Sequence, residues 1–180
     1  YEYNLANAIN DKYVKDPWVA ARQNFNANMK QEDIDFIKVS DGIQYHEEVK
    51  WRLELYHKNT WNRLVKPLIM ISAIDQHHAD VLENMIKSDD FFEWRYKNKV
   101  LKVYSNQTGE IKDDMIEQLL KVERVDNSVE IIVQVMMLKE WWDVNNLYTI
   151  VPLRASAAEI LTEQTIGRGL RLPYGEWTWD

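Results

Sequence analysis

The sequence contains no cysteine among its 180 residues. This absence excludes disulfide bonds and cysteine-ligated metal sites, and it is typical of a cytosolic protein. No apolar run approaches the ~18 residues that a membrane-spanning helix requires, and no signal peptide is recognisable at the start of the sequence. We therefore expect a cytoplasmic protein that does not associate with a membrane.

Several motifs that carry chemistry are also missing from the sequence. There is no Gly-x-x-x-x-Gly-Lys-Ser/Thr loop, whose main-chain N–H groups would bind nucleotide phosphates. There is no Asp-Glu-x-His motif to hold a metal, no pair of histidines four positions apart, and no nucleophile elbow or recognisable nuclease site. We therefore expect neither a metal site nor a tightly bound cofactor in this chain alone.

Positive charge is scarce, since 22 Lys and Arg residues face 29 Asp and Glu residues and the formal net charge is −7. A free-standing nucleic-acid-binding protein is usually basic, so any DNA contact would be local or shared with parts of a longer protein. Tyr1 in place of an initiator Met also indicates a fragment of a longer chain. The one basic cluster is expected to be a solvated edge, with DNA-phosphate binding less favoured. It comprises Arg95, Lys97, Lys99 and Lys102.

Apolar runs alternate with amphipathic stretches along the chain, a pattern that predicts an α/β fold with a mostly parallel sheet and helices on both faces. The strands are expected at 68–73, 100–104, 129–135 and 148–153. The helices are expected at 31–38, at 43–64, from an N-cap at Asp75 onward, and at 111–122, the last burying Met115, Ile116, Leu119 and Leu120. At 180 residues, the chain fits one domain with a sizeable core.

A group of polar residues near the end of the chain has a spacing with chemical meaning. Gln164, Arg168 and Arg171 stand at i, i+4 and i+7, which places them on one face of a helix. Ser156 and Glu159 have the spacing of a capping box that would open this helix. Two arginines and an amide suit a polyanion such as a triphosphate. Gly167 and Gly169 leave room beside the arginines for a ligand or another backbone.

The Gln-x-x-x-Arg-x-x-Arg pattern resembles the last conserved motif of superfamily 2 helicases and translocases. Segments 135–144 and 146–155 resemble the preceding helicase motif, in wording close to that of the Res subunit of type III restriction-modification enzymes. Lys66–Ile71 and His78–Asp80 are similar to the opening strand and helix of that family's second motor lobe. Val14–Pro17 and Arg22–Phe25 are similar to the entry into the same lobe.

The resemblance implies a RecA-like motor lobe of an ATP-dependent DNA helicase or translocase. Residues 1–40 would be an entry segment and residues 41–180 the second lobe, while the first lobe of the parent chain would hold ATP and Mg²⁺. Arg168 would be the catalytic arginine finger. Arg171, Gln164, Gly167 and Asp143 would contribute to the nucleotide site, Asp143 by contacting the ribose or orienting an arginine. Duplex DNA and a methyltransferase (Mod) subunit would be the partners.

The sequence departs from the family pattern at three tryptophans. Trp141 stands where relatives have a glycine, and Trp177 and Trp179 stand where they have Arg and Gly. An indole at 141 would strain the loop or fill the nucleotide cleft. The alternative function is therefore a non-catalytic nucleotide- or protein-binding module that retains the motor-lobe fold.

Four residues of the expected 43–64 helix carry further predictions. His46 and His57 are expected at the surface of the protein. Trp51 and Trp61 are expected in the core or at a contact with another lobe, rather than as platforms for stacked bases.

Overall fold

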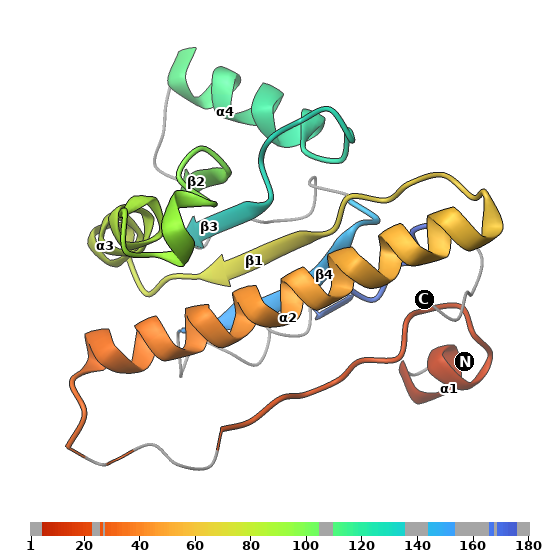
Figure 1. Cartoon of the computed structure of the whole chain (residues 1–180), viewed down its shortest axis with the longest axis horizontal. Coiled ribbons are helices and arrows are strands. Elements are labelled where there is room, and N and C mark those ends of the chain that lie inside the picture. The colour runs from red at the N-terminus through yellow and green to blue at the C-terminus, as the bar shows by residue number, and fades with distance from the viewer. Residues whose placement is uncertain are drawn as a thin grey trace.

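The computed structural model shows four parallel strands with helices on both sides (Figure 1). It describes residues 5–22, 26, 28–104, 110–135, 144–153, 166–167 and 169–175. The strands are β1 (Leu68–Ser72), β2 (Val100–Tyr104), β3 (Ile131–Val135) and β4 (Leu147–Pro152), in the sheet order β2-β3-β1-β4. All three pairings are parallel. The predicted α/β class is confirmed, and each strand lies within two residues of its expected bounds.

The helices cover both faces of the sheet. They are α1 (Leu5–Asn10), α2 (Gln31–Thr60), α3 (Gln76–Lys87), α4 (Glu110–Lys121) and the short 3-10 helix η1 (Phe92–Trp94). The path from β1 to β2 crosses the sheet in one direction and the path from β2 to β3 returns in the other. Because crossovers between parallel strands are right-handed, α3 and α4 lie on opposite faces.

Two apolar cores hold the layers together, and alternate residues of β1 point into each. Ile69 and Ile71 face the core that α2 and α3 cover, while Leu68 and Met70 face the core that α4 covers. This double burial explains why the strand reads as an unbroken apolar run. The first core also contains Val39 and Ile43 of α2 and Ala79, Leu82 and Ile86 of α3. The second contains Met115 and Leu119 of α4.

A single 30-residue helix, α2, replaces the two helices expected at 31–38 and 43–64. It runs across positions 40 and 41, where the entry segment was expected to end. Gly42 lets the helix continue against the sheet, because a Cβ added there would lie 2.4 Å from Cγ2 of Val151. The helix ends at Thr60, and the C-cap residue Trp61 that follows has a left-handed φ of 60°.

Several side-chain expectations are wrong. His46 is completely buried rather than at the surface, and Leu120 is 67% exposed rather than inward. Trp51 and Trp61 are 62% and 88% exposed, which contradicts a core position for both; their contact with another lobe stays a prediction. The buried ring of His46 has a polar partner there, because its Nε2 lies 3.3 Å from the carboxylate of Glu130, the residue before β3.

The pairing of β1 with β4 contains a bulge. Leu68 pairs with Leu147, but Ile69 pairs with Thr149, so Tyr148 is an extra residue in β4.

Among the described residues, no helix has both the length and the apolar character that a bilayer crossing needs.

Candidate functional site

The carboxyl ends of the four strands meet at one edge of the sheet, which is where ligands bind in parallel α/β folds. The ends of β3 and β1 are linked here, because Nε2 of Gln134 donates to Oγ of Ser72 at 3.0 Å. Chain positions 136–143 follow β3 directly. Asp143 and Trp141 therefore lie outside the described residues, and their predicted roles stay predictions.

The turn from β1 into α3 lies at this same edge. Oδ1 of Asp75 accepts a hydrogen bond from the main-chain N–H of His78 at 2.8 Å, so the predicted N-cap is confirmed. This bond satisfies one of the free N–H groups of the first helical turn. The main-chain N–H of Ile74 donates to Nδ1 of His78 at 3.1 Å. Asp75 and His78 together fix the conformation of the turn.

The C-terminal motif is described only in part. Gln164, Arg168 and the capping-box residues Ser156 and Glu159 lie outside the described residues. Residues 166, 167 and 169 are helical, but Arg171 lies in a bend after the helix, so a common helical face does not extend to this residue. A common face for Gln164 and Arg168 stays a prediction, as does a phosphate contact from Arg171.

The two glycines of the motif have different surroundings. A Cβ added to Gly169 would lie 3.0 Å from Cδ1 of Ile150 and 3.9 Å from the carbonyl oxygen of Leu147. A Cβ added to Gly167 would meet nothing within 4 Å. Gly169 therefore permits close packing against β4, whereas Gly167 faces open space. The part of Gly167 in nucleotide binding stays a prediction.

Lys15 holds the end of this segment beside the amino end of β4. Its main-chain N–H donates to the carbonyl of Leu170 at 2.7 Å, and its Nζ donates to the carbonyl of Leu147 at 2.9 Å. The same Nζ lies 3.8 Å from the ring centroid of Tyr148, which is cation–π distance. The Val14–Pro17 segment, singled out in the sequence, thus packs against the segment that carries Arg171.

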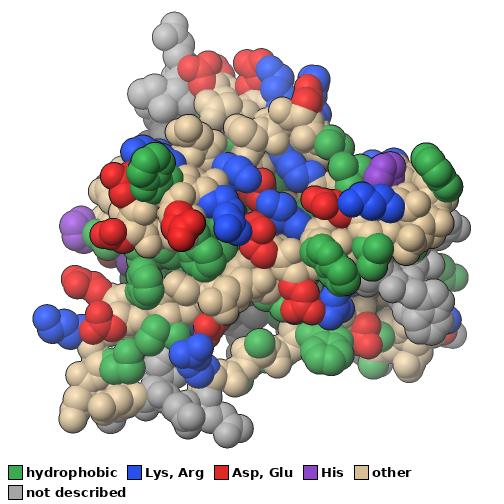
Figure 2. Space-filling model, in the orientation of Figure 1, with side chains coloured by type: hydrophobic (Ala, Val, Ile, Leu, Met, Phe, Trp, Pro, Cys, Tyr) green, Lys and Arg blue, Asp and Glu red, His purple; other side chains and the backbone are tan. Residues whose placement is uncertain are grey.

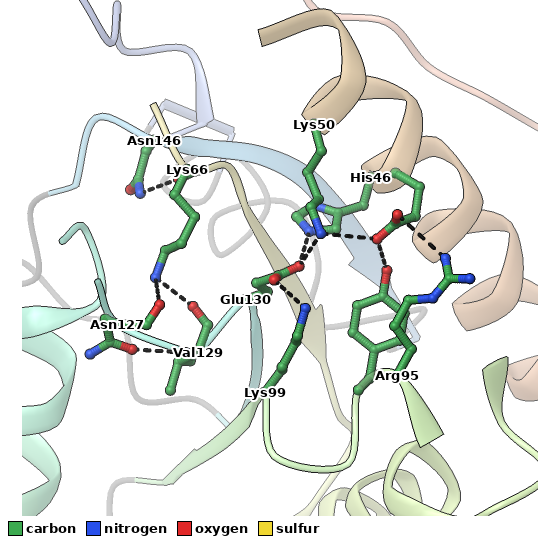
Figure 3. Close-up of polar contacts among 11 residues, drawn as sticks. His46, Lys50, Lys66, Arg95, Lys99, Asn127, Val129, Glu130 and Asn146 are labelled. Carbon is green, nitrogen blue, oxygen red and sulfur yellow. Dashed lines mark hydrogen bonds and ion pairs between the residues drawn. The ribbon is translucent and has the colours of Figure 1, made fainter. Parts of the chain in front are cut away.

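Polar residues precede every strand at the opposite, amino edge of the sheet: Lys66, Lys99, Glu130 and Asn146 (Figure 3). Glu130 accepts from Nζ of Lys99 at 2.6 Å and from Nζ of Lys50, on α2, at 2.9 Å. Burial raises the pKa of Glu130, but hydrogen bonds from His46, Lys50 and Lys99 outweigh it, so the net pKa lies well below 4.5.

Lys66 has a different environment at the same edge. Its Nζ donates to the main-chain carbonyls of Asn127 and Val129, each at 2.8 Å. Burial lowers the pKa of Lys66 from 10.5 to about 8, and the carboxylates of Glu130 and Asp126 oppose this only in part. The amide of Asn146 donates to the carbonyl of Lys66 at 2.7 Å. The polar groups of this edge are largely engaged with one another, which leaves the carboxyl edge as the better candidate site.

The predicted basic cluster does not form a free cationic surface. Arg95 pairs with Glu47 at 3.5 Å, Lys97 with Asp89 at 3.3 Å, and Lys102 with Glu83 at 2.7 Å, while Lys99 pairs with Glu130. Figure 2 shows acidic and basic side chains interleaved over this face. The expectation of a solvated edge fits Arg95 and Lys97, whose side chains are about half exposed. Lys99 and Lys102 are more buried.

Sequence reasoning missed the residues that organise these two edges. Asp35, Gln134 and Glu130 are polar but buried, at 4%, 3% and 7% exposure. No spacing pattern identifies them, since their partners come from distant parts of the chain. Within the described ranges, no group of three or more His, Asp or Glu residues could hold a metal ion.

Two curated proteins are similar to this chain. It is 24% identical, over an alignment of 191 positions that covers 98% of the chain, to the Res subunit of the type III restriction-modification enzyme EcoPI of Escherichia phage P1. It is 34% identical, over an alignment of 82 positions that covers 41% of the chain, to the Res subunit of the type III restriction-modification enzyme EcoP15I of Escherichia coli. The chain spans only 18% and 8% of the lengths of these relatives. No family model matches the sequence. The chain is thus distantly similar to type III Res subunits.

Proposed function

We propose that this chain is the second motor lobe of an ATP-dependent DNA helicase or translocase, the restriction (Res) subunit of a type III restriction-modification system. The observation that carries the proposal is the similarity to a Res subunit along 98% of the chain. The parallel sheet with helices on both faces supports it, because the RecA-like fold has this architecture.

In this proposal the nucleotide binds at the carboxyl edge, between this lobe and the first lobe of the parent chain. The first lobe holds ATP and Mg²⁺, because the present sequence has no phosphate-binding loop. Arg168 stabilises the charge on the transferring phosphoryl group. Arg171, Gln164, Gly167 and Asp143 complete the nucleotide site. The parent acts on duplex DNA with a methyltransferase (Mod) subunit, in the cytoplasm.

Substitution of the proposed arginine finger tests this function in the full-length parent. Arg168→Ala is expected to lower ATP turnover by roughly 10³–10⁵-fold, with most ATP binding retained because the charge acts mainly in the transition state. Arg124→Ala is a matched control, since Arg124 is exposed and pairs with Asp126, two positions away, at 2.8 Å. Near-normal turnover in the Arg168 variant would remove this residue from the mechanism.

A non-catalytic nucleotide- or protein-binding module is the second candidate, and the tryptophan at position 141 favours it. The same assays distinguish the two functions. A wild-type parent that binds ATP but does not hydrolyse it, with or without duplex DNA, would support the module.

A further inference from the structure

His78 connects two elements that are distant in sequence. Its Nδ1 accepts a hydrogen bond from the main-chain N–H of Ile74 at 3.1 Å. Its Nε2 lies 3.0 Å from Oδ2 of Asp35, in the first turns of α2. The other oxygen of Asp35 accepts from Nε2 of Gln31 at 2.9 Å. A continuous chain of hydrogen bonds thus runs from the start of α2 to the turn between β1 and α3.

The two contacts determine which ring nitrogen of His78 carries the hydrogen. A main-chain N–H can only donate, so Nδ1 of His78 must present its lone pair. The ring proton is then on Nε2, which donates to Asp35. Both nitrogens are occupied, so in this arrangement the imidazole serves neither as a general base nor as a metal ligand. Its remaining role is to connect Asp35 with Ile74.

Burial makes this connection specific. Asp35 is 4% exposed although it lies in the first turns of a helix whose neighbouring residues 31–33 are exposed. A carboxylate so deeply buried is costly unless hydrogen bonds satisfy it. Phe36 packs edge-on against Phe91, which follows α3, with ring centroids 5.9 Å apart. The start of α2 is therefore attached to the α3 region by polar and apolar contacts together.

The turn held by His78 belongs to the carboxyl edge. The main-chain N–H of Ala73 donates to the main-chain carbonyl of Gln134 at 2.9 Å, and the N–H of Leu153 donates to the main-chain carbonyl of Ser72 at 3.1 Å. The turn and the strand end before it are thus bonded to β3 and to the residue that follows β4, at the carboxyl edge of the sheet. At the other end of the connection, α2 follows an extended segment, residues 15–22, that runs along the outside of the protein (Figure 1).

We propose that Asp35 and His78 are a positioning pair that couples α2 to the carboxyl edge. They fix the β1–α3 turn relative to α2, so a displacement of α2 alters the geometry of the edge. The pair touches no reacting group in this inference and acts through the turn. The expected effect on ATP turnover rests on the proposed function, whereas the coupling between α2 and the turn does not.

Two substitutions at His78 separate the two halves of the connection. In His78→Asn, the amide oxygen replaces Nδ1 as acceptor for Ile74, but the side chain is too short to reach Asp35. In His78→Gln, the amide nitrogen takes the place of Nε2, and the acceptor for Ile74 is lost. His77→Asn is the matched control, because His77 is exposed and adjacent in sequence.

The experiment measures DNA-stimulated ATP turnover and amide hydrogen exchange in the full-length parent. His78→Asn is expected to lower kcat by about 2- to 30-fold, the range of coupling free energies of 0.5–2 kcal/mol, with little change in KM for ATP. In the same variant, the rate of amide hydrogen exchange is expected to rise both in peptides covering residues 31–40 and in peptides covering residues 73–79. His77→Asn is expected to match wild type in both measurements.

Two outcomes would overturn the inference: wild-type kcat in His78→Asn, or faster exchange that is confined to residues 73–79. If the wild-type parent has no ATPase activity, the proposed function fails, and the exchange result alone decides whether α2 and the turn are coupled. If His78→Asn does not fold, Asp35→Ala breaks the same connection from the side of α2, and the same two readouts apply.

Discussion

The imidazole of His46 and the carboxylate of Glu130 lie 3.3 Å apart in the protein interior, although 84 positions separate them in the chain. His46 has no exposed surface. Glu130 also accepts hydrogen bonds from Lys50 and Lys99 (Figure 3). Through this one carboxylate, the middle of α2 is joined to the starts of β2 and β3.

Removal of the Glu130 charge is expected to destabilise the protein. Glu130→Gln keeps the shape of the side chain but weakens three hydrogen bonds from cationic or polar donors, at a cost of about 2–3 kcal/mol near neutral pH. Urea denaturation of wild type and variant measures the difference. Glu117→Gln is the control, because Glu117 is exposed and pairs with Lys121 on its own helix. Equal stabilities of wild type and Glu130→Gln would contradict the prediction.

The same difference is expected to depend on pH. The pKa of Glu130 in the folded protein lies below its ordinary value of 4.5, so the unfolded chain takes up the proton first as the pH falls. The stabilisation is therefore complete above about pH 4.5 and is lost as the pH falls towards the folded-state pKa. Wild type and Glu130→Gln should converge in free energy of unfolding under acid conditions. A constant difference down to about pH 3 would show that the charge is not the cause.

Lys66 is expected to give a pH dependence of the same sign, but in the alkaline range. Burial lowers its pKa to about 8 in the folded protein, against 10.5 ordinarily. Between these values the unfolded state binds more protons, so the contribution of Lys66 to stability rises with pH. The free energy of unfolding of wild type relative to Lys66→Met should increase across this window. Lys58→Met, at an exposed position of α2, controls for the loss of a lysine. Parallel curves of the free energy of unfolding against pH for wild type and Lys66→Met would contradict the lowered pKa of Lys66.

Gly42 is expected to tolerate no side chain. Alanine favours a helix over glycine by ~1 kcal/mol, but its Cβ would lie 2.4 Å from Val151, and overpacking of a core costs about 1–3 kcal/mol. Gly42→Ala should therefore lower the thermal midpoint, and Val151→Ala in the same chain should recover part of the loss. Gly167→Ala, which meets no neighbour within 4 Å, should be neutral or stabilising. A gain in stability from Gly42→Ala would show that the helix adjusts freely.

Trp141 is expected to impair nucleotide hydrolysis in the parent. If the loop after β3 needs a close main-chain approach, Trp141→Gly should raise ATPase activity or ATP affinity. Trp61→Gly is the matched control, since Trp61 is exposed, has a φ of 60° and lies at the end of α2. An unchanged Trp141→Gly variant would mean that this position tolerates the indole.

The strands and the N-cap of α3 could be predicted because their signals are local. The apolar run 68–73 gave β1 to within one residue, and Asp75 gave the start of α3. The strand order and the burial of His46 could not be predicted, since both depend on contacts between distant segments. The exposure of Leu120 could not be predicted either. In α4, Met115 and Leu119 face the core, whereas Leu120 points away from it.

The nucleotide site was predicted by resemblance more than by physics. The spacing of Gln164, Arg168 and Arg171 indicates a helical face, but the bend at Arg171 ends the helix before that residue. Pro173 follows two positions after Arg171, but a proline marks only the neighbourhood of a helix end and not the residue at which the helix stops. Asp35 escaped prediction because its partner, His78, lies 43 positions away.

The bulge at Tyr148 also affects how the protein behaves among copies of itself. In the described sheet, β4 is an edge strand, and a regular edge is a template on which a strand of another molecule can pair. An extra residue twists the strand and interrupts that template. Pro152, at the carboxyl end of β4, has no N–H with which to hydrogen-bond a strand of another molecule. Gly169 packs beside Ile150 of the same strand. The sheet is therefore protected against edge-to-edge aggregation on the side of β4.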